Sequence, residues 1–230
     1  MRKLELDPTQ TNAPIFVARS IHAQFKPGSR HRATSNGPQS DQAYQSVLER
    51  DPSNDDAYNA VAYLYGAIKD NDKQMEWITR RTSMDGVSND KRAEAYTVLA
   101  SKKWDCSFKI TEQRENQQNV VKDGKTLIQF KKPKEQSDFD TAQQCTADGM
   151  ELIGKAISLN PESESAWSYK TNLLREGAKL SEMDGKADLK ADYNKQADEA
   201  QKVTVKLSEE NNRRKKEAEA QKALTKQATS

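Results

Sequence analysis

The chain has 230 residues, of which 34% are hydrophobic and 31% are charged. A mean hydropathy of −1.02 argues against one deep globular core, so we expect an elongated protein with much exposed surface. Basic and acidic residues, 37 and 35 in number, leave a net charge of only +2. This balance gives no reason to expect nucleic acid, an anionic membrane or an acidic substrate, and no run of 18 apolar residues predicts a membrane span.

A short phrase that ends a helix recurs along the chain. It reads LELDP at residues 4–8, LERDP at residues 48–52 and SLNP at residues 158–161. Proline cannot continue a helix and disfavours helical backbone in the residue before it, so each phrase predicts a helix end. Apolar residues at helical spacing resume about six positions later, which predicts a new helix after each break.

The first two of these breaks are separated by ten residues more than the 34-residue interval that follows them. The excess falls in the segment 26–39, which is rich in Gly, Pro and Ser and predicts a loop. Residues 1–7 look like the end of a second helix, so the partner of that helix would precede Met1.

Pro52 and Gly86 lie 34 residues apart, and glycine is the other common residue at helix ends. Packing residues recur at matching places in units of this length: Ala57, Tyr58, Val61, Ala62, Tyr65 and Ile78, then Gly149, Ile153, Ala156, Pro161, Ala166, Trp167 and Leu174. With these residues, two helices in a unit of 34 residues resemble the tetratricopeptide repeat (TPR) family. Gln74 and Arg81 depart from the family, which usually has small residues there.

The resemblance covers roughly residues 1–207 and implies an all-α, right-handed solenoid of antiparallel helical hairpins. Insertions interrupt it at about 26–39 and 110–137. A helix is expected at 93–108, and a few further extra residues precede that helix. A later helix is expected to end by Met183, with a break at Asp184-Gly185 and a long C-terminal helix from Ala187. Residues 208–230 have no large apolar residue before Leu224, so they predict a charged helical or frayed tail.

The second insertion contains the sequence NVVKDGKTLIQF at residues 119–130. Its two apolar runs flank Asp123-Gly124, a dipeptide that favours a tight hairpin turn, so a short β-hairpin is expected. Because an isolated hairpin is marginally stable in water, its apolar side must pack against a neighbouring helix or a partner.

Cys106 and Cys145 fall on the apolar stripes of the helices that flank this insertion. An antiparallel pair would place both thiols at the insertion end, within reach of a disulfide. The alternative is two reduced, buried thiols. A disulfide would imply an oxidising compartment such as the bacterial periplasm. A periplasmic or secreted location requires a signal upstream of this start; otherwise we expect the cytoplasm.

The chain is poor in residues for catalysis or metal binding, with two histidines and no HExxH, GxSxG, CxxC or phosphate-binding glycine motif. We therefore expect no enzyme activity, no metal and no cofactor. The basic run at 213–216 lacks aromatic residues and is followed by Glu217 and Glu219, which favours a solvated helix face over a nucleic-acid or membrane contact.

The resemblance implies a non-catalytic scaffold that binds a protein or peptide on the concave face formed by the first helix of each unit. There, asparagines would pair with a ligand backbone and arginines with carboxylates. Two alternatives remain: a solvated face without a dedicated ligand, and an assembly subunit that oligomerises through its open terminal repeat and C-terminal helix. The positions that match the family's groove are Asn12, Arg19, His22, Asn59, Tyr63, Thr97, Ser101, Trp104, Ser168, Asn172 and Arg175.

Overall fold

The computed structural model describes residues 42, 44–49, 51, 54–67 and 69–228. The predicted loop at 26–39 and the groove residues Asn12, Arg19 and His22 lie outside these ranges. Contacts between Cα atoms divide the chain into two compact units, residues 1–96 and 97–230. The expectation of a single repeat domain over 1–207 followed by a tail stays a prediction.

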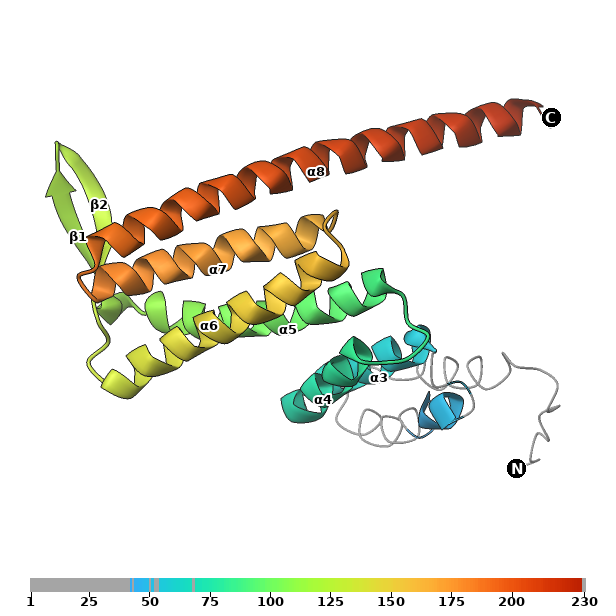
Figure 1. The fold of residues 1–230 in the computed structure, drawn as a ribbon, viewed down its shortest axis with the longest axis horizontal. Coiled ribbons are helices and arrows are strands. Elements are labelled where there is room, and N and C mark those ends of the chain that lie inside the picture. Colours follow the sequence, from blue (N-terminus) through green and yellow to red (C-terminus); the bar gives the residue numbers. More distant parts are fainter. Residues whose placement is uncertain (1–41, 43, 50, 52–53, 68, 229–230) are drawn as a thin grey trace. The chain divides into compact units, whose positions relative to one another are not determined.

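In the first unit, α3 (Asp55–Ala67) and α4 (Asn71–Thr82) form a helical hairpin (Figure 1). Asp70 caps α4, because its carboxylate accepts the backbone N–H of Lys73 at 3.2 Å. Residues 44–49 are also helical, so the predicted break between them and α3 is confirmed. The buried side chains shared by these helices are Tyr44, Val47, Leu48, Ala57, Val61, Leu64, Tyr65 and Trp77.

Helix α5 (Asn89–Thr111) is longer at both ends than the helix predicted at 93–108. It starts earlier because Ser88 precedes it and its Oγ accepts the backbone N–H of Lys91 at 3.4 Å, which is the role of an N-cap residue. Gly86, with φ of 78°, makes the turn between α4 and this cap. The predicted break near this glycine is therefore confirmed: α4 ends at Thr82, and Gly86 lies in the turn that follows.

The second unit continues with three long helices, α6 (Gln136–Leu159), α7 (Glu164–Met183) and α8 (Ala187–Ala228). They follow one another as neighbours in Figure 1. Ser163 caps α7 by accepting the backbone N–H of Ala166 at 3.3 Å, directly after the predicted proline break. Gly185, with φ of 70°, lies in the predicted break between α7 and α8.

Between α5 and α6, the chain forms the short helix η1 (Arg114–Asn116) and the strands β1 (Gln117–Lys122) and β2 (Lys125–Phe130). The strands pair antiparallel, and Asp123 and Gly124 make the two-residue turn with φ of 52° and 70°. The predicted β-hairpin is confirmed. Its base packs on the helices, because Phe130 contacts a buried cluster made of Phe139, Ala142, Leu180 and Met183.

Small residues let the helices of the second unit approach closely. A Cβ atom on Gly149 of α6 would lie only 2.5 Å from Cδ2 of Leu173 on α7. Gly177 of α7 faces the Tyr193 ring of α8, where an added Cβ would lie 2.9 Å from Cε1. Ala197 and Ala200 of α8 are buried against Leu174. Side chains larger than hydrogen or methyl at these points would push the helices apart.

Helix α8 continues as one helix through the residues predicted as a tail. Beyond Leu207, Asn211 Nδ2 donates to Glu164 Oε2 at 3.0 Å, and Arg214 Nη1 contacts Glu162 Oε2 at 3.2 Å. These polar contacts join the middle of α8 to the start of α7. None of the helices in the described part of the chain is long and apolar enough to cross a membrane.

Candidate functional site

A disulfide joins α5 to α6 at the base of the hairpin insertion. Cys106 and Cys145 are bonded, with Cα atoms 6.1 Å apart. The bond closes a covalent loop that contains η1, both strands and the start of α6. The predicted pairing of these two residues is confirmed.

Next to the disulfide, a carboxylate is buried between α5 and α7. Glu176 is 1% exposed, and its Oε2 accepts hydrogen bonds from Thr111 Oγ1 at 2.7 Å and Ser107 Oγ at 3.4 Å. Thr146 of α6 donates to Ser107 Oγ at 3.0 Å. The second oxygen, Oε1, lies 2.6 Å from Lys179 Nζ. The charge is therefore buried with its hydrogen bonds and a counter-ion supplied.

Lys179 connects this buried network to the hairpin and to α5. Its Nζ lies 2.5 Å from Glu112 Oε1, 5.0 Å from the ring centre of Phe108 and 5.1 Å from that of Phe130. The ammonium group thus has two carboxylates and two ring faces around it. A side chain held in this way is a structural crosslink, and its charge is already neutralised.

Three aromatic rings from α5 and α7, those of Trp104, Phe108 and Tyr169, form a cluster that we call the aromatic face. The Trp104 ring centre lies 4.9 Å from that of Phe108 and 6.0 Å from that of Tyr169. Trp104 and Tyr169 are half-buried, and Phe108 is 37% exposed. Rings that are packed on one side and open on the other provide large apolar contact area at little cost in conformational entropy.

Several groove residues predicted in the second unit lie near the aromatic face. Ser101 precedes Trp104 by one turn of α5, and Ser168 and Asn172 flank Tyr169 on α7; all three are half-buried. Two others are engaged within the chain. Thr97 is buried at 4% exposure, and Arg175 Nη2 is paired with Asp198 Oδ1 of α8 at 3.2 Å.

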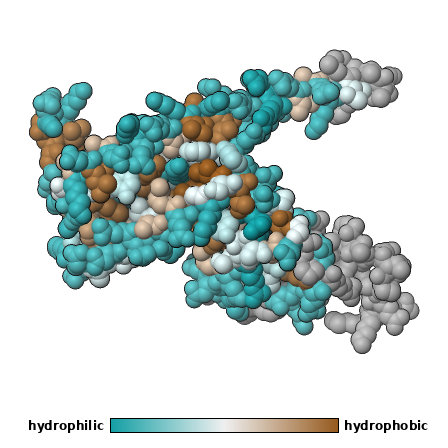
Figure 2. All heavy atoms as spheres, in the orientation of Figure 1, coloured by the Kyte–Doolittle hydropathy of each residue, from teal (hydrophilic) through white to brown (hydrophobic). Residues whose placement is uncertain are grey.

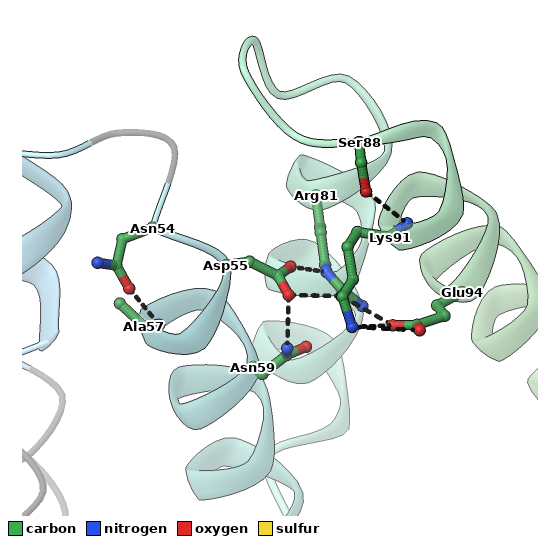
Figure 3. A network of polar contacts seen from close by, with 8 residues as sticks. All are labelled: Asn54, Asp55, Ala57, Asn59, Arg81, Ser88, Lys91 and Glu94. Carbon is green, nitrogen blue, oxygen red and sulfur yellow. Dashed lines mark hydrogen bonds and ion pairs between the residues drawn. The ribbon is translucent and has the colours of Figure 1, made fainter. Parts of the chain in front are cut away.

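The groove residues predicted in the first unit, Asn59 and Tyr63, lie one turn apart on α3. Tyr63 is 55% exposed. Asn59 is exposed and donates from Nδ2 to Asp55 Oδ2 at 3.2 Å (Figure 3). The Asn59 amide therefore belongs to a polar network within the unit.

That network centres on Arg81 of α4, which points between α3 and α5 in Figure 3. Its side chain is 7% exposed and pairs through Nε and Nη2 with the carboxylate of Asp55. The same Nη2 lies 3.0 Å from Glu94 Oε2. A guanidinium group is thus buried in the first unit with two carboxylate partners supplied.

A cleft of about 500 Å³ lies between α6, α7 and α8. Asp184 is one of the lining residues of the cleft. Hydrogen bonds from Lys132, the larger contribution, and from Lys186 lower the pKa of Asp184 to about 2. Nearby on α6, hydrogen bonds from Lys103 and Gln144 lower the pKa of Asp148. The cleft is lined by Gln143, Thr146, Ala147, Met150, Gly177, Leu180, Ser181, Asp184, Lys186, Leu189, Asp192, Tyr193 and Gln196.

Neither carboxylate is suited to act as a general acid at neutral pH, because both are held ionised by cationic neighbours. Across the part of the chain that the structure describes, no three His, Cys, Asp or Glu side chains are grouped to hold a metal. Sequence analysis missed this cleft, although Gly177 on the apolar stripe of α7 was a usable sign of close helix approach.

Comparison with known proteins gives little further guidance. No family model matches the chain, and no curated protein matches it. The solved structures that match include the crystal structure of MamA, at 20% sequence identity over 79% of this chain and 98% of that chain, with a TM-score of 0.27. A TM-score this low does not establish a shared fold.

Proposed function

We propose that this chain is a non-catalytic, TPR-like scaffold that binds an extended segment of another protein on the aromatic face. The observation that carries the proposal is the meeting of Trp104, Phe108 and Tyr169 from two different helices at partly open positions. Aromatic residues at such positions are the commonest hot spots of protein interfaces. A specific complex needs roughly 1,200 to 2,000 Å² of total buried area, which several adjacent helices together can supply.

The chemistry around the rings favours an apolar segment over a strongly charged one. Lys179 is neutralised by Glu112 and Glu176 within the chain. Beside the rings, Asn172 offers an amide to a ligand, and Ser168 offers a hydroxyl group. Such groups bind apolar side chains and the backbone of an extended peptide.

The test compares proteins captured from cell extract by the wild-type chain and by a Trp104→Ala, Tyr169→Ala variant. We expect the specifically captured partner to fall at least about tenfold with the variant, because hot-spot aromatics each contribute about 2 kcal/mol or more. Leu189→Ala, at an exposed position of α8, is the control and should retain capture. Undiminished capture by a double variant with wild-type helicity would exclude the aromatic face.

The assembly alternative is favoured by one feature of α8. This helix continues for 14 residues beyond Arg214, and Val205 on it is 47% exposed. A second chain would pack against the extension of α8 beyond Arg214, with Val205 as an apolar contact before it. Light scattering over a range of concentrations decides between the two functions: a mass that stays monomeric removes assembly, and a dimer that Val205→Lys dissociates supports it.

A further inference from the structure

The β-hairpin carries a second exposed surface that the scaffold function does not use. Val121 is 78% exposed and Ile128 is 56% exposed, and both lie on the same side of the two strands. That side carries no charged residue. The opposite side carries Leu127, which is 46% exposed, together with Lys122 and Lys125. Figure 2 shows apolar residues on the hairpin beneath a polar tip.

The strand register shows which backbone groups face outward. The N–H of Lys131 bonds to the carbonyl of Asn116, and the pairs that exchange hydrogen bonds alternate from there along the ladder. The N–H and C=O groups of Gln117, Asn119 and Val121 therefore point away from β2. Among the described residues, no backbone hydrogen bond outside the ladder reaches Asn119 or Val121.

The edge of β1 is the candidate edge, because it does not belong to the strand that packs on the helices. β2 is the strand that contacts α7. Along β1, charge appears only at Lys122, beside the turn, and there is no proline. Natural proteins usually protect an exposed strand edge with charge, proline or a bulge, so an unprotected edge is a site for strand addition.

The hairpin is also held firmly enough to present this edge. Asn116 is 1% exposed, and its Nδ2 donates to the carbonyl of Ile110 at 2.8 Å. Phe130 packs into the core at the other side of the base. The disulfide closes the loop that contains both strands. A docking segment would then lose only its own conformational freedom.

We propose that the free edge of β1 binds an extended segment of a partner protein as a third strand, with β-branched residues and at least one acidic residue in that segment. The acidic residue follows from charge. Residues 117–131 contain three lysines and one aspartate, and Lys122 lies directly opposite Lys125. Like charges in such a cross-strand pair repel, so a carboxylate from a third strand relieves the repulsion.

A protein strand fits this surface better than a lipid bilayer does. Open sheet edges are not tolerated in hydrocarbon, because their N–H and C=O groups would lose their hydrogen bonds to water. A third strand satisfies the same groups while it covers the apolar side chains. Binding to anionic vesicles is accordingly an outcome of the test that counts against the proposal.

The test begins with a displayed library of random 12-residue peptides, selected on the full-length oxidised protein. We expect enrichment of peptides that alternate β-branched and acidic residues. A selected peptide, synthesised with a fluorophore, is then titrated by anisotropy against Asn119→Pro and Asn119→Thr. Proline removes the outward N–H, whereas threonine keeps it. We expect at least about tenfold weaker binding to Asn119→Pro and a change below about twofold for Asn119→Thr.

Amide exchange measured by NMR gives the readout specific to strand addition. The amides of Asn119 and Val121 should exchange fast in the free protein and slowly in the complex. The amide of Val120, which faces β2, should be slow in both, and its protection in Asn119→Pro shows whether the hairpin is intact. If the hairpin is not intact in Asn119→Pro, the double variant Lys122→Glu, Lys125→Glu is used in its place. This double variant should bind the selected peptide at least tenfold more weakly than the wild type does.

Three results would overturn the proposal: no enriched peptide, equal binding to Asn119→Pro with an intact hairpin, or binding of phosphatidylglycerol vesicles that Asn119→Pro leaves unchanged. The Trp104→Ala, Tyr169→Ala variant separates this site from the aromatic face. It should bind the selected peptide normally. A peptide that this variant loses and Asn119→Pro retains binds the aromatic face, and the strand-addition site is then wrong while the scaffold function stands.

Discussion

The two units of this chain are stabilised in different ways. In the first, large side chains such as Tyr44 and Trp77 fill the space between helices, and the main polar contribution is the buried Arg81. In the second, α6, α7 and α8 meet over glycines and alanines, and α5 is joined to its neighbours by a disulfide and the Glu176 network.

This difference explains how a chain with low hydropathy can hold its helices together. Close contact over small residues gains dispersion energy but buries little apolar area for each side chain. In the second unit, a covalent link and charge-assisted links add to the apolar burial between the helices. They lie beside the hairpin and the aromatic face, so the elements that stabilise this unit also position its exposed surfaces.

Removing the disulfide should change the stability of the second unit relative to the first more than any other substitution considered. Cys106→Ala with Cys145→Ala opens a loop between residues 39 positions apart, and the chain-entropy account predicts a loss of roughly 3 to 4 kcal/mol in the free energy of unfolding. Hydrogen exchange by mass spectrometry should show faster opening of residues 97–230 and little change before residue 97. The wild-type protein in reductant is the control and should match the variant; equal loosening of both units would contradict the comparison.

Arg81→Met should be next in size and should act on the first unit. It leaves the Asp55 carboxylate, whose side chain is 22% exposed, without its main counter-ion. The Glu94 side chain is 52% exposed, so water can solvate its carboxylate when Arg81 is removed. We therefore expect the free energy of unfolding, measured by urea denaturation, to fall by roughly 2 to 3 kcal/mol, less than for a fully buried ion pair. Adding Asp55→Leu should recover part of it, since no orphaned charge remains. A neutral effect of Arg81→Met would mean that apolar packing alone stabilises this unit.

Two glycines of α6 should respond to alanine with opposite signs. Gly149→Ala forces a methyl group against buried Leu173 and should destabilise the protein by about 1 to 3 kcal/mol. Gly154→Ala meets no atom within 4 Å and should stabilise it by about 0.5 to 1 kcal/mol through helix propensity. Thermal unfolding of both variants checks this. A stabilising Gly149→Ala would show that the helices are not held at contact distance.

The features that sequence predicted are those with a local chemical cause. The Asp123-Gly124 turn, the break at Gly185 and the restart after Pro161 each follow from the backbone preferences of a few adjacent residues. The cysteine pairing followed from two helical stripes and one antiparallel turn. The candidate groove residues near Trp104 came instead from the resemblance to the TPR family, and they stay predictions.

The features that sequence missed depend on contacts between distant segments. Glu176 looks like an ordinary exposed helix residue until Thr111, 65 positions away, donates to it. Thr97 was a groove position by its resemblance to the TPR family, and a resemblance in sequence does not say which neighbouring segments cover a position; Thr97 is 4% exposed. Nothing in the spacing of Arg81 showed that Asp55 and Glu94 would both reach it.

The smallest predicted effect concerns the acid stability of the second unit. The pKa of Asp184 is lowered from 3.8 to about 2, so the stabilisation from this carboxylate is complete above about pH 4 and is lost as the pH falls toward 2. Asp184→Asn should lower the urea midpoint at neutral pH. Between pH 4 and pH 2, the urea midpoint of this variant should fall less than that of the wild type. Lys132→Gln should reproduce more of this change than Lys186→Gln, because Lys132 makes the larger contribution. An unchanged slope of the urea midpoint against pH in Asp184→Asn would show that the Lys132 contact at the base of the hairpin does not stabilise the second unit.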